Sequence, residues 1–233
     1  KYLGNHFDIH TGGIDHIPVH HTNEIAQGYG AFGQQTANFW VHNAWVVGKN
    51  GTKMSKSLGN IFTAQELIEK KIDPLAYRYL FLTSHYRKGI EFTLDNLENV
   101  AETYKKLRKM VSEWPDKGLI NVGYQKTFND LVSNDLAMPE AIALVWKLIK
   151  DKRVKPEDKK TTLLNWDRIL SLSLDKKYQE DIIPSEIIKL AEGRIQAKVI
   201  KDWIEADKLR NLIKERGYSM EDGINNSYKL KKL

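Results

Sequence analysis

Two lysines three residues apart, with small hydroxyl side chains beside them, are the residues of this sequence best suited to phosphate chemistry. The segment reads Lys53-Met54-Ser55-Lys56-Ser57 and follows a glycine-bearing stretch over residues 48–52. Lysine ammonium groups supply point charges and serine hydroxyls supply hydrogen-bond donors, so such a loop can close over a polyphosphate. An ordinary basic surface loop is the alternative, but it does not require the complete five-residue pattern.

A predicted strand that runs into glycines is a second candidate for nucleotide contact. Residues 7–10 read as a short buried strand, which Thr11, Gly12 and Gly13 end. Glycines at the end of a strand let the backbone approach a nucleotide closely. A plain turn is the alternative, because paired glycines are common punctuation.

Histidines and a glutamate gather just after these glycines. Pro18 predicts the start of a helix over residues 19–29. On such a helix His20 and Glu24 are four residues apart and share one face, as metal ligands do. His10, His16 and His21 lie nearby in the sequence. A solvated polar helix face is the alternative.

An aromatic residue among charges marks the C-terminal part of the chain. Trp203 lies near Lys198, Lys201 and Arg210, a composition suited to stacking an unpaired base and holding its phosphate. Carboxylates such as Asp207 and Asp222 accept hydrogen bonds from base amino groups. The alternative is a tryptophan packed inside a helical pair.

The remaining pattern predicts the elements that position these residues. One or two strands are expected over residues 38–47, with Trp40 and His42 as packing residues. Capping signals predict helices over residues 64–71 after Thr63, 74–82 after Asp73, and 93–112 from Thr93. Residues 114–118 break the pattern and are the best candidate for a domain boundary. Further helices are expected within residues 122–174, around a solvated charged turn at 150–160, and within residues 187–216, before a mobile tail at 228–233.

Composition excludes several classes of protein. The 233 residues carry 36 Lys plus Arg against 30 Asp plus Glu, a formal net charge of +6, and no cysteine. A disulfide framework is therefore excluded, and the modest basic balance is compatible with a polyanionic partner. No apolar run approaches the roughly 18 residues of a membrane span, and no secretory signal is present.

The motif at residues 53–57 resembles the KMSKS signature of class I aminoacyl-tRNA synthetases. Residues 4–27, reading GNHFDIHTGGIDHIPVHHTNEIAQ, are similar to cysteinyl-tRNA synthetases within that class. The similarity continues in the following segments: residues 73–74, 77–79, 83–87, 197–198, 201–203, 206–207 and 221–223. Between about residues 103 and 185 the resemblance lies mainly in helical pattern.

The resemblance implies a fold and a division into parts. The fold would be an α/β remnant of a class I nucleotide-binding, Rossmann-like domain, followed by a mostly α-helical stem-contact and anticodon-binding region. The expected parts are the end of the catalytic domain with the KMSKS loop, a stem-contact fold, a helical bundle and an anticodon-binding domain, at residues 1–60, 61–115, 116–185 and 186–233.

The resemblance also implies an activity, cysteine–tRNA ligation. ATP with Mg²⁺ would activate cysteine, and the acyl group would pass to tRNA-Cys, in a cytoplasmic and monomeric protein with no membrane partner. The implied catalytic residues are Lys53, Lys56 and His10. The implied nucleotide contacts are Gly12, Gly13, Asp15 and Lys56, and the implied zinc ligands are His20 and Glu24. The implied anticodon-reading residues are Lys198, Trp203, Asp207 and Asp222, with Arg78, Arg87 and Lys88 as phosphate contacts or solvated charges.

Two features of the family pattern do not occur in this sequence. It contains no H-x-G-H quartet, the second class I signature, and none of the cysteines that complete the family's zinc site. We therefore expect the C-terminal half of a synthetase, inactive alone, with an incomplete zinc site that is empty or weak. Two alternatives stay open: an RNA-binding helical module that has lost catalysis, and a mycothiol-type cysteine ligase, which would lack the tRNA-reading residues.

Overall fold

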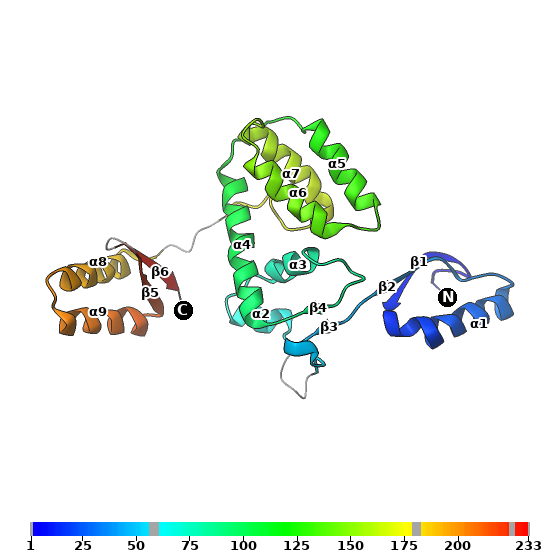
Figure 1. Ribbon diagram of the computed structural model, residues 1–233, viewed down its shortest axis with the longest axis horizontal. Coiled ribbons are helices and arrows are strands. Elements are labelled where there is room, and N and C mark those ends of the chain that lie inside the picture. Colours follow the sequence, from blue (N-terminus) through cyan, green and yellow to red (C-terminus); the bar gives the residue numbers. More distant parts are fainter. Residues whose placement is uncertain (1, 56–60, 179–182, 224–226, 233) are drawn as a thin grey trace. The chain divides into compact units, whose positions relative to one another are not determined.

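The computed structural model describes residues 2–55, 61–178, 183–223 and 227–232 (Figure 1). The chain forms two compact units, Lys1–Tyr178 and Gln179–Leu233. The expected division into four parts stays a prediction. A single hydrophobic core in unit 1 includes residues from both sides of the expected boundary at 115/116.

Unit 1 begins with a parallel strand–helix–strand arrangement. Strand β1 (Phe7–Gly13) pairs in parallel with β2 (Ala37–Asn43), and Ile9 lies opposite Phe39. Parallel neighbours require a crossover connection, which here consists of the turns η1 (Ile14–His16) and η2 (Ile17–His21) and the helix α1 (Thr22–Phe32). Pro18 lies in a π-helical turn, so regular helix begins three residues later than predicted.

The prediction that residues 7–10 form a buried strand is wrong in its burial. Ile9 is 59% exposed and Phe39 is 66% exposed. Side chains alternate across a strand, so Ile9 and Phe39 share one face while His10 and Trp40 share the other. His21 from the crossover lies against His10 and Trp40, and it therefore covers only the second face.

The segment that leads into the KMSKS motif is a short closed loop. Strand β3 (Val46–Val47) pairs in parallel with β4 (Ile90–Glu91). The 3-10 turn η3 (Lys49–Gly51) follows, and Gly48 N donates to Thr52 O at 2.8 Å. Asn50 N also donates to Glu91 Oε2 at 3.2 Å, which ties the loop to β4.

Helices α2 to α7 make up the rest of unit 1. They span Ala64–Glu69, Pro74–Leu82, Leu94–Glu113, Val122–Ser133, Met138–Lys150 and Pro156–Leu170. The predicted caps are confirmed: Thr63, Asp73 and Thr93 each accept a hydrogen bond from a backbone N–H of the first turn. Such caps satisfy donors that have no partner inside the helix.

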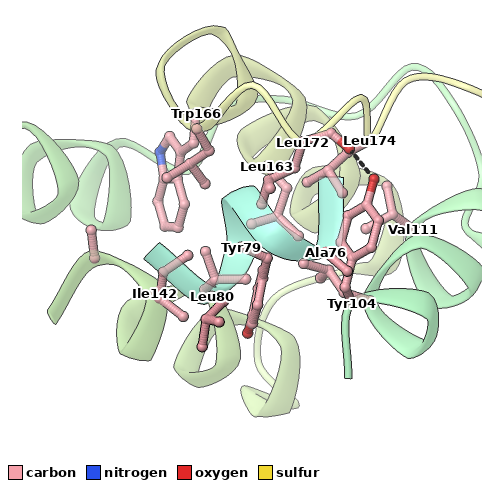
Figure 2. Packing of buried hydrophobic residues seen from close by; sticks show 14 of the residues in the cluster. Ala76, Tyr79, Leu80, Tyr104, Val111, Ile142, Leu163, Trp166, Leu172 and Leu174 are labelled. Atoms are coloured by element: carbon pink, nitrogen blue, oxygen red, sulfur yellow. Dashed lines mark hydrogen bonds between the residues drawn. The ribbon is translucent and has the colours of Figure 1, made fainter. Parts of the chain in front are cut away.

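The core of unit 1 lies where these helices meet (Figure 2). The Phe128 and Trp166 rings stack with centroids 4.6 Å apart. The buried Tyr104 hydroxyl donates to Leu172 O at 2.6 Å. Burial leaves neither group access to water, so each needs the other as its hydrogen-bond partner. The bond joins α4 to the chain that follows α7.

The prediction of a solvated charged turn over residues 150–160 is wrong for its second half. Helix α7 begins at Pro156, and Lys159 is only 8% exposed. Its Nζ donates to Ile149 O at 2.7 Å, a carbonyl of the last turn of α6. The lysine therefore satisfies a helix C-terminus, where a cation is favoured.

Unit 2 is a helical pair with a β-hairpin. Helices α8 (Ser185–Val199) and α9 (Trp203–Glu215) precede β5 (Tyr218–Asp222) and β6 (Tyr228–Lys232). The expected mobile tail is wrong over residues 228–232, because β6 pairs antiparallel with β5. Within the described residues no helix has both the length and the apolar character needed to cross a membrane.

Candidate functional site

Three histidines of the first forty-odd residues, His10, His21 and His42, converge on one face of the β1–β2 sheet. His10 comes from β1, His21 from the end of η2, and Glu24 from the first turn of α1. His42 and Trp40 come from β2. Parallel strands and the crossover place these residues together, although they are separated by up to 32 positions in the sequence.

Glu24 is the centre of this group. Its Oε2 lies 2.8 Å from His10 Nε2, and its Oε1 lies 3.2 Å from His20 Nε2. Glu24 Oε2 is nevertheless buried without a hydrogen bond of good geometry among the described residues. A buried carboxylate oxygen without a hydrogen-bond donor is normally satisfied by a water molecule or a cation.

His21 is held in place from two sides. Its Nδ1 lies 2.7 Å from His42 Nε2, a hydrogen bond in which one ring nitrogen donates and the other accepts. A side chain on Gly12 would come within 2.5 Å of His21 Cε1, so glycine makes room for the ring. Burial, followed by the neighbouring His10, lowers the pKa of His21 and favours its neutral form.

Three of these side chains can reach one metal ion. Ligand atoms of His10, His21 and Glu24 all lie within 4.8 Å of one another. This set differs from the pair that the resemblance implies, because it contains Glu24 but not His20, whose side chain is 62% exposed. Two imidazoles and a carboxylate are a donor set known from zinc sites, so the residues fit that metal.

The expected nucleotide residues lie at the end of β1. Gly12 and Gly13 pair with His42 and Asn43 of the neighbouring strand. The Asp15 carboxylate lies over Gly13, in the space that a side chain there would fill. The close packing of Gly12 against His21 gives this glycine a structural role, and the nucleotide contacts stay a prediction.

Lys53 lies at the exit of the closed loop. It forms an isolated antiparallel bridge with Val47, and Met54 packs against the helical core. The second lysine of the motif, Lys56, lies outside the described residues, as do residues 57–60. The catalytic roles of Lys53, Lys56 and His10 therefore stay predictions.

Two of the expected phosphate-contacting arginines are engaged within unit 1. Arg78 Nε donates to Leu170 O at 2.6 Å, which satisfies a carbonyl at the end of α7. Arg87 Nε lies 2.8 Å from Asp135 Oδ2, and the Tyr86 hydroxyl donates to the other oxygen of that carboxylate at 2.6 Å. Both arginines therefore have structural partners.

The four residues expected to read an anticodon lie in unit 2, in different surroundings. Trp203 starts α9 and is 59% exposed, next to the exposed apolar side chains of Ile200 and Ile204. Asp207, one helical turn later, lines a hollow of about 480 Å³ between α9 and β5 together with Arg210 and Lys214.

Lys198 and Asp222 pair with each other. Lys198 Nζ lies 3.0 Å from Asp222 Oδ2. The buried Arg194 donates to both oxygens of Asp222, through Nη1 to Oδ1 at 2.5 Å and through Nη2 to Oδ2 at 3.1 Å. The hydrogen bonds from Arg194, and to a smaller extent that from Lys198, hold the pKa of Asp222 well below its usual range.

Sequence reasoning did not identify four contributors to these sites. His21 was noted only as a neighbour of better candidates, Trp40 and His42 were predicted to be packing residues, and Arg194 was not singled out at all. Alternation along the two strands would have placed His10, Trp40 and His42 on one face, had the parallel register been known. No local signal marks Arg194.

Comparisons with known proteins point to one family. The family model described as "tRNA synthetases class I (C) catalytic domain" matches residues 1–102. Cysteine–tRNA ligase 1 of Burkholderia lata is 40% identical over 223 residues, which cover 95% of this chain and 47% of the relative. Cysteine–tRNA ligase of Treponema denticola is 36% identical over 257 residues, which cover 95% of this chain and 52% of the relative. The chain thus spans about half the length of the curated relatives it matches.

A solved structure shares the fold. The LeuRS chain in a ternary LeuRS–tRNA–LeuAMS complex from Agrobacterium radiobacter matches 72% of this chain and 26% of its own length, with a TM-score of 0.53 and 15% sequence identity. At that identity the likeness concerns the fold alone. It confirms the predicted fold class, a Rossmann-like α/β part followed by helices.

Proposed function

We propose that this chain belongs to the cysteinyl-tRNA synthetase family and is the part of a cysteine–tRNA ligase that carries the KMSKS loop and binds tRNA-Cys. The observation that carries the proposal is the match to cysteine–tRNA ligases over 95% of the chain. That match extends beyond the catalytic-domain model, which ends at residue 102, into the helical part and unit 2.

In the proposed reaction, cysteine attacks the α-phosphate of ATP, cysteinyl-adenylate forms and pyrophosphate leaves. A hydroxyl of the terminal ribose of tRNA-Cys then attacks the carbonyl carbon of the adenylate, the acyl group passes to that hydroxyl and AMP leaves. Lys53 and Lys56 would place positive charge beside the phosphates, where negative charge develops, so they act by electrostatic stabilisation rather than by covalent chemistry. Gly12, Gly13 and Asp15 would border the ribose and adenine.

Around the amino acid, the histidine group of unit 1 would hold and orient the substrate. His10 would lie on the substrate side of Glu24, consistent with its 2.8 Å approach to that carboxylate. Trp40 would exclude water from the same face, since its ring lies against both His10 and His21. When bound, zinc would supply a soft Lewis acid that prefers a cysteine thiolate to the hydroxyl of serine.

Unit 2 would read the anticodon. Trp203 is a large exposed aromatic side chain at a helix start, which suits stacking on an unpaired base. Asp207 would accept hydrogen bonds from a base amino group beside the cations that line the same hollow. Lys198 and Asp222 already bind each other, so we propose that they act as a preformed pair presenting one remaining face to RNA.

The proposed partners are tRNA-Cys, cysteine and ATP with Mg²⁺, for a protein that works as a monomer in the cytoplasm. We also propose that these 233 residues do not activate cysteine by themselves, because the sequence contains neither an H-x-G-H quartet nor a cysteine. ATP–pyrophosphate exchange dependent on cysteine, measured with the pure chain, would overturn that part of the proposal.

The experiment that tests the function is tRNA binding at one fixed salt concentration, because phosphate contacts make every affinity salt-dependent. We expect the chain to prefer tRNA-Cys over the same tRNA with an altered anticodon. Trp203→Ala should remove that preference and cost about 1–3 kcal/mol of binding free energy, the value of one base–aromatic stack.

Trp45→Ala is the matched control, because Trp45 is equally exposed, at 58%, and lies in unit 1. It should bind tRNA-Cys as the unchanged chain does. Equal binding of all the tRNAs by the unchanged chain would contradict anticodon reading and leave only a general attraction to polyanions.

A further inference from the structure

Helix α9 carries an aromatic ring, a carboxylate and two cations along one face. Trp203, Asp207, Arg210 and Lys214 follow one another at intervals of four, three and four positions, the spacing of residues that share a side of an α-helix. All four side chains are exposed. We call these four residues the α9 stripe.

The second half of the α9 stripe lines a hollow in unit 2. Asp207, Arg210 and Lys214 border the hollow of about 480 Å³ between α9 and β5. Tyr218 and Met220 of β5 border it as well, and both belong to the buried core of the unit. Sites for small ligands measure roughly 300–1,000 Å³, so the hollow has room for one nucleotide.

The two cations of the stripe are available to a ligand. Among the residues that the structure describes, neither the Arg210 nor the Lys214 side chain has an ion-pair or hydrogen-bond partner. By contrast, Lys208 of the same helix lies 3.2 Å from Glu205 Oε2. Residues four apart on a helix have Cβ atoms about 5–6 Å apart, so Arg210 and Lys214 can reach one bound group together.

The charges around the hollow favour a phosphate group. The described residues that line it include two cations and one carboxylate, that of Asp207, so positive charge exceeds negative charge by one. Guanidinium and ammonium groups both bind phosphate oxygens, and arginine does so through two parallel hydrogen bonds. Asn211 adds an amide donor between the two cations in the sequence.

The structure also selects among the cations near Trp203 in the sequence. Lys198 is bound to Asp222 at 3.0 Å, whereas Arg210 lies two helical turns from Trp203 in the α9 stripe. Single-stranded RNA is commonly held by an aromatic side chain under a base and by a row of cations along the backbone. The α9 stripe has both features on one helix face.

We propose that Arg210 and Lys214 together bind one backbone phosphate of the tRNA strand whose base stacks on Trp203. Such a contact carries no sequence information, because phosphate contacts position an RNA and base contacts specify it. The inference rests on the tRNA binding proposed above and adds to it a second site on α9, with a different chemistry.

The test measures the association constant for tRNA-Cys at salt concentrations between about 50 and 200 mM, because each neutralised phosphate releases counterions. In Arg210→Gln/Lys214→Gln, the slope of the logarithm of this constant against the logarithm of the salt concentration should become shallower by about 0.7, the value for one phosphate of a single strand. Binding should weaken by the same factor, within about twofold, for tRNA-Cys and for the same tRNA with an altered anticodon. An unchanged slope would overturn the phosphate contact.

Lys189→Gln/Lys208→Gln is the matched control. It also removes two positive charges from exposed positions of unit 2, and neither lysine is among the described residues that line the hollow. Its slope should change by less than about half as much, because salt screens charges that do not touch the RNA. Equal changes in both variants would overturn the proposal, since net charge alone would then explain them.

NMR keeps the proposal testable if Arg210→Gln/Lys214→Gln fails to fold, which circular dichroism would reveal. In the unchanged chain, tRNA-Cys should shift the Arg210 Nε signal of a ¹⁵N-arginine spectrum, and an unshifted signal would overturn the contact. Inorganic phosphate added at constant ionic strength should leave the tRNA affinity unchanged. A loss of affinity confined to the unchanged chain would assign the hollow to free phosphate instead.

The outcome separates this site from the function proposed above, because the slope does not depend on which tRNA is bound. A smaller slope in Arg210→Gln/Lys214→Gln without any anticodon preference would refute anticodon reading and support the phosphate site. An unchanged slope with the preference retained would do the reverse. Absence of tRNA binding by the unchanged chain would overturn both.

Discussion

At the scale of single residues, Asp222 shows how one carboxylate can have a structural task where the sequence suggests base recognition. It lies at the end of β5 and binds Arg194 and Lys198 of α8. Arg194 is 5% exposed, so its charge needs a partner inside unit 2. The carboxylate therefore fastens the β-hairpin to the first helix of the unit.

We predict that Asp222→Asn destabilises unit 2 by about 1–2 kcal/mol, a charged hydrogen bond discounted for the partial exposure of the carboxylate. The pKa of Asp222 is depressed in the folded chain, so its contribution is present above the unfolded pKa of about 3.9 and is lost as the pH falls below it. Urea unfolding at pH 7 and at pH 3 measures both effects, and the difference from the unchanged chain should shrink at pH 3.

Asp207→Asn is the control for this change, because Asp207 is exposed and lines the open hollow. It should alter the free energy of unfolding by less than about 0.5 kcal/mol. A larger loss for Asp207→Asn than for Asp222→Asn would contradict the structural role assigned to Asp222.

At the scale of elements, helix α1 positions the candidate metal ligand Glu24, and two of its glycines have opposite surroundings. A side chain on Gly28 would come within 2.9 Å of Thr36 Cγ2 and 3.0 Å of Gln34 O. A side chain on Gly30 would meet nothing within 4 Å. Gly28 thus allows the connection to β2 to lie close against the helix, whereas Gly30 has no such role.

We predict opposite effects of alanine at these two positions. Gly28→Ala should destabilise unit 1 by about 1–3 kcal/mol, because backbone must move to accommodate the added methyl group. Gly30→Ala should stabilise α1 by about 0.5–1 kcal/mol, because glycine loses more backbone entropy in a helix. Thermal unfolding followed by circular dichroism compares the two, and equal effects would refute the close approach at Gly28.

Local sequence signals predicted the starts of helices well, but they did not predict contacts between residues far apart in the sequence. The starts of α2, α3 and α4 followed from Thr63, Asp73 and Thr93, because a cap acts within four residues. The pairing of β6 with β5 was missed, because a lysine-rich tail has no apolar alternation strong enough to indicate a strand. The burial of Lys159 was missed because its acceptor, Ile149 O, belongs to another helix.

At the scale of the whole molecule, the two units have separate cores of unequal size. Unit 1 buries side chains from Leu67 to Leu174 in one cluster, whereas the cluster of unit 2 has, among its described residues, five buried members: Ile187, Ala191, Ile213, Tyr218 and Met220. Stability rises with the surface that a unit buries. We therefore expect unit 2 to open first.

We predict two unfolding transitions in urea, resolved by residue-specific hydrogen exchange. Tyr104→Phe should lower only the transition of unit 1, by about 1–3 kcal/mol, because it leaves the buried Leu172 carbonyl without its donor. Tyr29→Phe, at a half-exposed position of unit 1, should change neither transition measurably. One cooperative transition that both units share would show that they do not unfold separately.

The candidate sites were predictable from sequence only in part, because the contacts between distant residues that complete them have no local sequence signal. His20 and Glu24 were recognised from their types and spacing, since one helical turn brings residues four apart together, and His10 from the family resemblance. Which histidine faces the carboxylate depends on the parallel register of β1 with β2 and on the π-helical turn at residues 17–21, and neither has a local sequence signal. The partnership of Arg194 with Asp222 likewise arises only when the hairpin closes.

The buried lysine of α7 also has a consequence for chemical reactivity. Lys159 donates its ammonium group to Ile149 O, and its Nζ lies 5.9 Å from the centre of the Trp114 ring, so an amine-reactive ester cannot approach it in the folded chain. Lys152, exposed in the preceding turn, offers the same reagent an open target. In a covalent labelling experiment read by mass spectrometry, the extent of Lys159 acylation would therefore report the fraction of molecules in which α6 and α7 have separated.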